Sequence, residues 1–259
     1  MKATARHIRQ AIAIRTRTMA AIMPTTMSMA EAARVLQLQR LFQLASPSLP
    51  VGAFAYSEGL EAAVEAGWLS TPDDVQDWLA ATLDECMARL DLPLCLRLHA
   101  AWSKDDLDAV RDWSRLNLAS RETSERRAQE RHLGTALASL LQGMNVAEAA
   151  HWRIGGQYVQ DVSFAALFSL AAVRWQVNAE DTAAALAWAW LENQVLAAVK
   201  LVPLGQTQGQ RLLFALADAV PAALATAAQL EDDDLGGSLP GVTFACTDHE
   251  TMYSRLYRS

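Results

Sequence analysis

Few side chains in this chain of 259 residues combine a reactive group with a spacing that suggests chemistry. The segment Ala55–Gly59 reads AYSEG and differs by one residue from the GxSxG nucleophile elbow, which makes Ser57 a candidate nucleophile of a helical hydrolase. That elbow requires a preceding strand, and Pro50-Val51-Gly52 does not provide one. The competing interpretation is that Ser57 caps a helix whose first turn carries Glu58 and Glu61, where the helix dipole favours carboxylates.

Two histidines stand at a spacing from a cysteine that a metal ion can use. Cys246-x-x-His249 has ligand spacing, and Cys95 and His99 lie four residues apart on a predicted helix. Neither pair has further ligands nearby, and two ligands do not close a site. We interpret Cys95 and His99 as a buried structural pair and His249 as part of an ordinary tail segment, with a transient metal contact at the tail as the alternative. No CxxC pair is present, so neither a disulfide framework nor a thiolate zinc site is indicated.

The sequence does not support nucleotide binding. Gly205–Gly209 lacks the Lys and hydroxyl residue that complete a phosphate loop, and no GxGxxG is present. Lys200 follows the apolar run Val195–Val199, so its head group either extends to the surface or is held by an acid. Gln206 and Gln210 either cap helix ends or present a polar patch.

The element that must position the first group of these residues is the stretch Leu41–Glu61. It holds two prolines and two glycines, yet it is mostly apolar, which is not the composition of a surface linker. We predict a fixed, partly buried hinge between helices, with Gly52 freeing the backbone and a helix restarting near Ser57. The helix before it is predicted over Ala30–Leu44, with these residues facing inward: Val35, Leu38, Leu41 and Phe42.

Two later helices carry clear start signals. Thr71 followed by Pro72 is typical of an N-cap and a first helical position, and Pro93 is expected to end or kink the helix downstream. Asn178, with Asp181 three residues on, is expected to cap a long helix that is apolar nearly all round. Such a helix belongs in the centre of a bundle or in a subunit interface.

Three further segments have a distinctive composition. Arg121–His132 mixes both charge signs, which predicts a salt-bridged, solvated helix face. Pro203–Gly209 should interrupt a helix, and Pro221 should kink the next one. Glu231–Gly237 reads as a polar linker.

Ala-rich amphipathic segments recur along the chain without strand alternation, which predicts an all-α fold. We expect a single helical bundle-like domain of about ten helices over residues 30–235. Residues 1–29 form a basic arm that we predict to be disordered. Residues 236–259 form a tail too poor in apolar residues for a domain, and its aromatic side chains predict a segment that becomes ordered on a partner.

Composition limits the class of protein. Hydrophobic residues make up 52% of the chain, but no uninterrupted apolar run approaches the length of a membrane span. The formal net charge is −7 and the first forty residues are basic, so the remaining body is strongly acidic. A nucleic-acid partner is therefore not expected. The cysteine pattern fits a reducing cytosol.

The hinge Leu41–Glu61, reading LFQLASPSLPVGAFAYSEGLE, is similar to the N-terminal signature of the urease accessory protein F (UreF) family. Glu192–Leu213, reading ENQVLAAVKLVPLGQTQGQRLL, resembles the other long signature of that family. Ala119–Gly134 and the C-terminal MYSRLYRS also match in kind. The four blocks stand in the right order and cover roughly residues 38–259.

This resemblance implies a cytoplasmic, helical accessory factor of urease and not an enzyme. Members of the family bind UreD, called UreH in some organisms, recruit the UreG GTPase, form dimers, and take part in nickel delivery into apo-urease. Nickel and GTP belong mainly to these partners, so no cofactor, nucleic acid or membrane is expected for this chain. The alternatives are a helical hydrolase using Ser57 and a binding module for an unrelated partner.

The resemblance also implies partner-binding residues in the two signatures and the tail. Carried over by position, they are Tyr56, Ser57, Glu58, Glu61, Lys200, Gln206, Gln210, Arg255 and Tyr257. Lys200 and Arg211 flank the second signature and could act on the GTPase as a positively charged finger, although gating is preferred. The long basic arm and the lack of a His-rich tail depart from the family pattern, so independent nickel storage is not expected.

Overall fold

The computed structural model describes residues 28–154, 157–158 and 161–259, and of residues 153–160 it describes no side chains. The chain divides into two compact units, residues 1–39 and 40–259. The predicted N-terminal arm lies outside the described residues, except for Ser28 and Met29.

The first described helix is α2, Met29–Ala45, as the sequence predicts. Its predicted inward face is wrong in part, because Val35 is 42% exposed and Phe42 is 69% exposed. Leu44 is the residue of α2 that is buried. Periodicity identifies an apolar face but does not say what covers it.

A long helical rod follows in three parts: α4, Pro72–Thr82, the π-helical segment η2, Leu83–Asp91, and α5, Leu92–Ser103. Thr71 starts it with a capping box, as predicted: its side chain accepts from Asp74 N, whose carboxylate accepts from Thr71 N. The rod runs through Pro93 without ending there, because the backbone is already in π geometry just before the proline. Leu92 N donates to the carbonyl five residues back.

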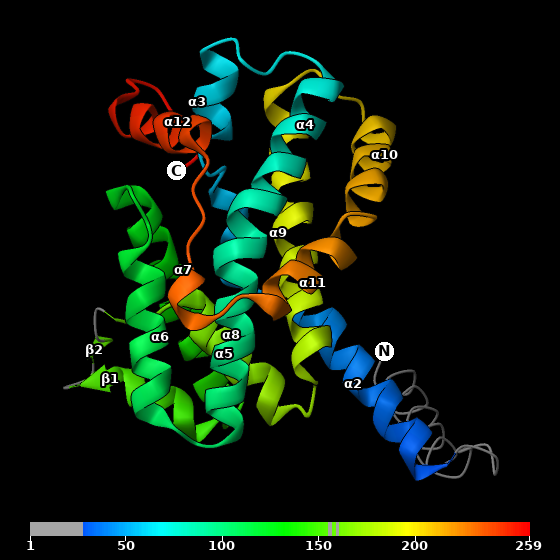
Figure 1. Ribbon diagram of the computed structural model, residues 1–259, viewed down its shortest axis with the longest axis vertical. Coiled ribbons are helices and arrows are strands. Elements are labelled where there is room, and N and C mark those ends of the chain that lie inside the picture. The colour runs from blue at the N-terminus through cyan, green and yellow to red at the C-terminus, as the bar shows by residue number, and fades with distance from the viewer. Residues whose placement is uncertain (1–27, 155–156, 159–160) are drawn as a thin grey trace, which may run out of the picture. The chain divides into compact units, whose positions relative to one another are not determined.

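The remaining helices confirm the all-α fold class (Figure 1). They are α3 Leu60–Glu65, α6 Leu107–Ala119, α7 Ser124–Gly143, α8 Phe164–Arg174, α9 Ala179–Leu201, α10 Gln206–Ala217, α11 Val220–Gln229 and α12 Pro240–Thr251. Short 3₁₀ segments lie at Ala53–Ala55, Ala147–Trp152 and Asp232–Asp234. One small antiparallel pair joins β1, Arg153–Ile154, to β2, Gln157–Tyr158.

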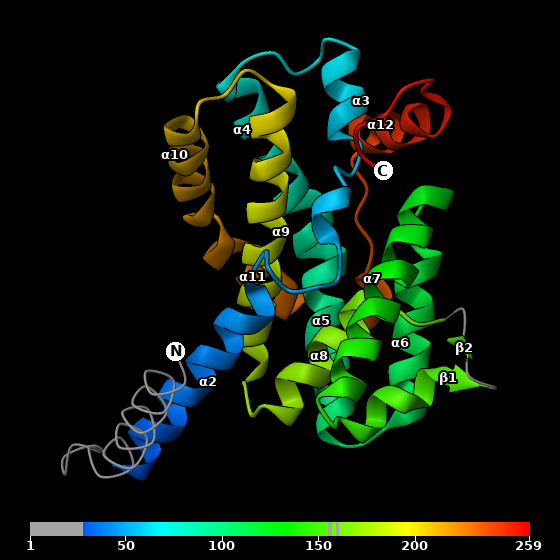
Figure 2. The ribbon, with the colours of Figure 1, turned by 180° about the vertical axis from the view of Figure 1, so that it is seen from behind.

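Helix α9 occupies the centre of the second unit. Asn178 caps it by accepting from Asp181 N at 2.7 Å, as predicted. The helix packs against α3, α4, α5, α8, α10 and α11, and both views place it among these helices (Figures 1 and 2). Its apolar surroundings therefore come from within the chain, although Trp188 and Leu196 each remain 39% exposed.

The predicted kink at Pro221 is a full break between α10 and α11. By length and composition, Gln206–Gln229 is the one stretch among the described helices that would suffice to cross a membrane, although it contains no uninterrupted apolar run of that length. Here it forms two helices, and α10 packs on α9 and α4.

The predicted polar linker is tightly fixed where it passes η2. Gly236 N donates to Arg89 O at 3.1 Å. A Cβ added at Gly237 would lie 2.0 Å from Glu85 O, so only glycine fits at this crossing. The linker therefore holds η2 and leads directly into α12.

The tail differs from the expectation that it orders only on a partner. Helix α12 packs on α3 and α7, and the following residues return to the hinge (Figures 1 and 2). Tyr257 is 7% exposed and Ser259 is 1% exposed. Sequence composition missed this because the contacts that bury these residues lie about 200 positions earlier.

Candidate functional site

Three residues of the hinge have a left-handed backbone conformation. Gly52 has φ 81°, Glu58 has φ 56° and Gly59 has φ 85°. The helix predicted to restart at Ser57 begins instead at Leu60, with Gly59 at the N-cap. Left-handed φ is costly for a residue with a Cβ, so the surroundings of Glu58 must hold its backbone in place.

Ser57 and Glu58 form a small nest of donors around one oxygen of the tail. Ser259 O accepts from Ser57 N at 2.7 Å, from Glu58 N at 2.9 Å and from Ser57 Oγ at 2.6 Å. Ser57 Oγ also accepts from Glu61 N at 3.3 Å, so it supports the first turn of α3. The structure does not support the hydrolase hypothesis for Ser57, because the hydroxyl is fully buried, donates its hydrogen to Ser259 O and accepts from Glu61 N.

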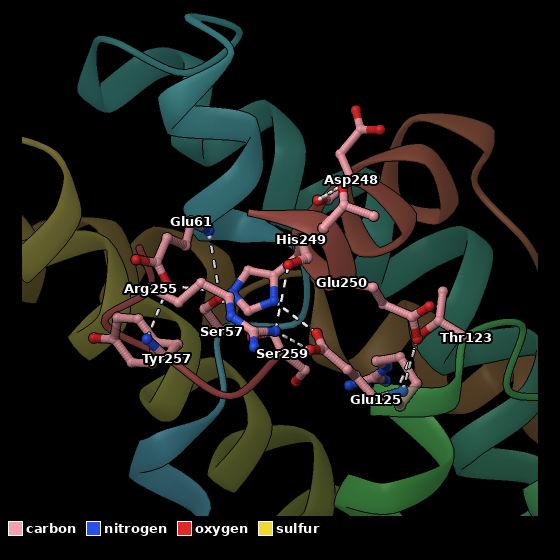
Figure 3. A network of polar contacts seen from close by, with 12 residues as sticks. Ser57, Glu61, Thr123, Glu125, Asp248, His249, Glu250, Arg255, Tyr257 and Ser259 are labelled. Atoms are coloured by element: carbon pink, nitrogen blue, oxygen red, sulfur yellow. Dashed lines mark hydrogen bonds and ion pairs between the residues drawn. The ribbon is translucent and has the colours of Figure 1, made fainter. Parts of the chain in front are cut away.

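Glu61 carries the main contacts between α3 and the tail (Figure 3). Its Oε1 accepts from Leu256 N at 2.6 Å, and its Oε2 accepts from Tyr257 N at 2.8 Å. His249 Nε2 lies 3.2 Å from the same Oε2. Both carboxylate oxygens are thus occupied by donors from the tail and α12.

His249 lies between two carboxylates and has no exposed surface (Figure 3). Its Nδ1 is 2.7 Å from Glu125 Oε2, and Arg255 Nη1 contacts the other Glu125 oxygen. Each ring nitrogen of His249 therefore faces a carboxylate oxygen from a different helix. We call these four residues, Glu61, Glu125, His249 and Arg255, the His249 clasp.

The two Cys/His pairs make their contacts within the fold. Cys246 Sγ would lie 2.9 Å from a Cβ at Gly59, so α12 rests directly on the hinge glycine. Burial raises the pKa of the Cys246 thiol to about 12, which disfavours the thiolate that a metal needs. His99 Nε2 contacts Val177 O, and Cys95 contacts Ser169. The described residues hold no group of three or more His, Cys, Asp or Glu arranged to bind a metal ion.

Glu58 is tied to the body by three donors. Arg126 Nη1 and Gln129 Nε2 each lie 2.6 Å from its Oε1, and Trp190 Nε1 lies 3.0 Å from its Oε2. Burial acts to raise the pKa of this carboxyl, but the charge of Arg126 and the hydrogen bonds outweigh it, so the pKa is lowered. These contacts hold the backbone of Glu58 in its left-handed conformation, in which the N–H groups of Ser57 and Glu58 both donate to Ser259 O.

The charge run is not solvated as predicted. Arg121 is 6% exposed and pairs with Asp91 and, at 2.8 Å, with Glu130. Glu130 also accepts from Phe164 N at 3.0 Å, and burial raises its pKa. These ion pairs form the polar wall of a cavity of about 110 Å³ whose other walls are the apolar side chains of the hinge, α8 and α9.

The predicted partner-binding residues fall into two groups. Tyr56, Ser57 and Glu61 in the hinge, and Tyr257 in the tail, are buried, and Tyr56 Oη contacts His132 Nδ1 at 3.1 Å. Their side chains bind other parts of this chain. Glu58, with 14% of its side chain exposed, does the same.

The other group lies at the surface and comprises Lys200, Gln206, Gln210 and Arg255. Lys200 extends outward at the end of α9, with its Nζ 5.9 Å from the centre of the Tyr257 ring. The exposure of Lys200 confirms the interpretation that its side chain reaches the surface. Gln208 caps α10, by accepting from Gly205 N at 2.8 Å, and leaves Gln206 and Gln210 exposed.

Sequence reasoning missed Gln129 as a partner of the hinge and Glu125 as a partner of α12 and the tail, and it gave His249 no structural role. Glu125 and Gln129 lie one turn apart on α7, and the carboxylate of Glu125 and the amide of Gln129 both face the hinge and tail. No local signal separates them from the other polar residues of the charge run.

Comparison with known proteins decides the family. The sequence model of UreF matches residues 69–217 of this chain. The chain belongs to the UreF family. The urease accessory protein UreF of Alkalilimnicola ehrlichii is 51% identical over 226 residues, which cover 86% of this chain and 96% of that protein. The UreF proteins of Hahella chejuensis and an Azoarcus species are 42% and 45% identical, over 86% and 90% of this chain and 99% and 100% of their own lengths. This UreF chain is therefore a urease accessory protein.

Proposed function

We propose that this UreF-family chain is a non-enzymatic scaffold that binds UreD, recruits or regulates the UreG GTPase, and so assists nickel insertion into apo-urease. Family membership supports the urease context. The observation that carries the scaffold role is the division of the signature residues: the hinge half is used inside the chain, while Lys200, Gln206 and Gln210 of the second signature are exposed.

Two surfaces are the proposed contacts. The tail and α12 expose Phe244, Tyr253 and Leu256, which suits a protein partner and supports assignment to UreD. The corner between α9 and α10 exposes Lys200 and Gln210, which supports assignment to the GTPase. The two surfaces meet where Lys200 lies over the Tyr257 ring.

The proposed scaffold role also specifies where nickel and GTP are bound, the cellular compartment and the self-association of the chain. Nickel and GTP are bound by the partners, the assembly works in the cytoplasm, and the chain forms a homodimer when it assembles. Trp188 and Leu196, the half-exposed side chains of α9, are the proposed self-contact.

The decisive experiment is size-exclusion chromatography with light scattering on this protein, UreD and UreG, mixed with and without GTP, Mg²⁺ and nickel. We expect a co-eluting complex whose mass contains this chain and UreD, and which takes up UreG. Separate elution under every condition would overturn the scaffold role. The same runs give the mass of this chain alone, which tests the homodimer.

A further inference from the structure

The cavity beside the Arg121 ion pairs has walls of two kinds. Its volume is about 110 Å³, and it lies among the hinge, α7, α8 and α9. Most of the wall is apolar, and its buried side chains include Leu44, Met87, Leu133 and Leu186. Phe54 and Leu196 also border the cavity and are partly exposed to solvent, so a small molecule can enter between them.

The polar part of the wall carries more negative than positive groups. Its charged residues are Glu58, Asp91, Glu130, Arg121 and Arg126. Arg126 balances Glu58, while Arg121 alone pairs with both Asp91 and Glu130. One carboxylate is therefore in excess, in agreement with the raised pKa of Glu130. An additional buried anion would meet this excess, so the wall disfavours an anionic ligand.

The same wall contains a hydrogen-bond donor that lacks an acceptor. Arg121 is 6% exposed, and its two terminal nitrogens contact carboxylate oxygens of Asp91 and Glu130. Its Nε is buried and has no hydrogen-bond partner among the described residues. An unpaired buried donor is costly, so a group that brings an acceptor oxygen is favoured here. An ammonium or amidinium group has no such acceptor.

We propose that this cavity binds a small neutral molecule with a primary carboxamide head and a branched apolar body. The carbonyl oxygen accepts from Arg121 Nε, and the amide N–H₂ donates to the carboxylate in excess. The apolar body packs against Met87 and Leu186. The inference goes beyond the proposed function, and its test requires neither UreD nor UreG.

The volume of the cavity limits the size of the ligand. A dry apolar cavity of about 150 Å³ accepts benzene, so a cavity of about 110 Å³ suits a molecule of about six heavy atoms. Isobutyramide has this size and combines the carboxamide with an isopropyl group, so it is the probe.

The ligand test compares three molecules that share the isopropyl group and differ in the planar head: isobutyramide, isobutyrate and isobutyramidinium. Titrations followed by protein NMR give the three dissociation constants. We expect about 1–10 mM for isobutyramide, which is within the range of binding energy per heavy atom for small ligands. The other two should bind at least about tenfold more weakly, because isobutyrate adds a negative charge and isobutyramidinium offers Arg121 no acceptor.

The position of the bound probe is tested separately. We expect intermolecular NOEs between the isobutyramide methyl groups and the side chains of Met87 and Leu186. The variant Ala189→Leu adds a larger side chain to the cavity wall and should weaken binding at least about tenfold. Ala184→Leu is the matched control, because Ala184 is also a partly buried residue of α9 but lines a different groove. Its affinity should stay within about twofold of the wild type.

Three outcomes would overturn the inference. Equal or tighter binding of isobutyrate or isobutyramidinium rejects the neutral carboxamide as the ligand class. NOEs confined to residues outside the cavity wall reject the site, even if Ala189→Leu fails to fold and gives no affinity. Failure of isobutyramide to bind the wild-type chain at about 100 mM rejects the site and its ligand together. None of these results bears on the scaffold role, which is judged by the complex with UreD and UreG.

Discussion

At the scale of single residues, the charges of this protein are used mainly inside the chain. Glu58 is paired with Arg126 near the hinge, and Arg121 with Asp91 and Glu130 beside it. A buried ion pair gains little over apolar packing, but removing one partner leaves an uncompensated charge. The main role of Glu58 is therefore to position the backbone: the residue adopts a left-handed conformation, and its N–H donates to Ser259 O.

We predict that Glu58→Gln lowers the free energy of unfolding by about 3–5 kcal/mol near neutral pH, because Arg126 loses its buried counter-charge. The folded pKa of Glu58 lies below its ordinary value of 4.5, so its contribution is full above that value and is lost as the pH falls through the folded pKa. The difference between wild type and variant should therefore shrink in acid. Urea unfolding at about pH 7 and about pH 4 measures it, and a gap that stays constant would contradict the assignment.

At the scale of elements, the rod α4–η2–α5 depends on a contact that no propensity predicts. The π-helical segment ends just before Pro93, a residue without an N–H. Gly236 N donates to Arg89 O, and the backbone at Gly237 lies against Glu85 O. The linker before α12 thus stabilises the π-helical segment η2, which lies about 150 residues earlier in the sequence.

We predict that Gly237→Ala destabilises the protein by about 1–3 kcal/mol or more, because its Cβ would lie 2.0 Å from the Glu85 carbonyl oxygen, which sits on rigid helix backbone. The matched control is Gly143→Ala at the end of α7, where an added Cβ meets nothing within 4 Å. That substitution should be neutral or stabilise by up to about 1 kcal/mol. Urea midpoints compare the two, and equal midpoints would reject the close crossing at Gly237.

At the scale of the whole molecule, the sequence allowed prediction of the features that depend on residues close together in the chain. The caps at Thr71 and Asn178 and the all-α class depend on neighbours a few residues apart, and they were predicted. The burial of Arg121 and the folded tail depend on partners in distant elements, and they were not. The candidate site shows the same division: the hinge residues were found, but their partners Gln129 and His249 become visible only once α7 and α12 are placed.

The position of Lys200 where the two proposed surfaces meet leads to a prediction about the assembly. Lys200→Ala should raise the dissociation constant for the UreG GTPase about tenfold, because it removes an exposed charge from the proposed contact. The free energy of unfolding of the Lys200→Ala variant should differ from that of the wild type by no more than about 0.5 kcal/mol, since the side chain is exposed. Lys104→Ala, with the same change of charge on an exposed residue at the end of α5, is the control and should leave the affinity unchanged.

The Arg211→Ala variant tests whether this chain only gates GTP hydrolysis by UreG or supplies an arginine that takes part in it. A finger that stabilises the transition state of GTP hydrolysis contributes about 10³–10⁵ to the rate, so its removal would abolish stimulated turnover while UreG still binds. We expect instead a change of less than about tenfold, because Arg211 lies on the exposed face of α10 beside Gln210, where contact with a partner changes binding and not the reacting atoms. Single-turnover GTP hydrolysis by UreG saturated with wild-type or variant chain measures it, and a loss of a thousandfold would assign the catalytic role to this arginine.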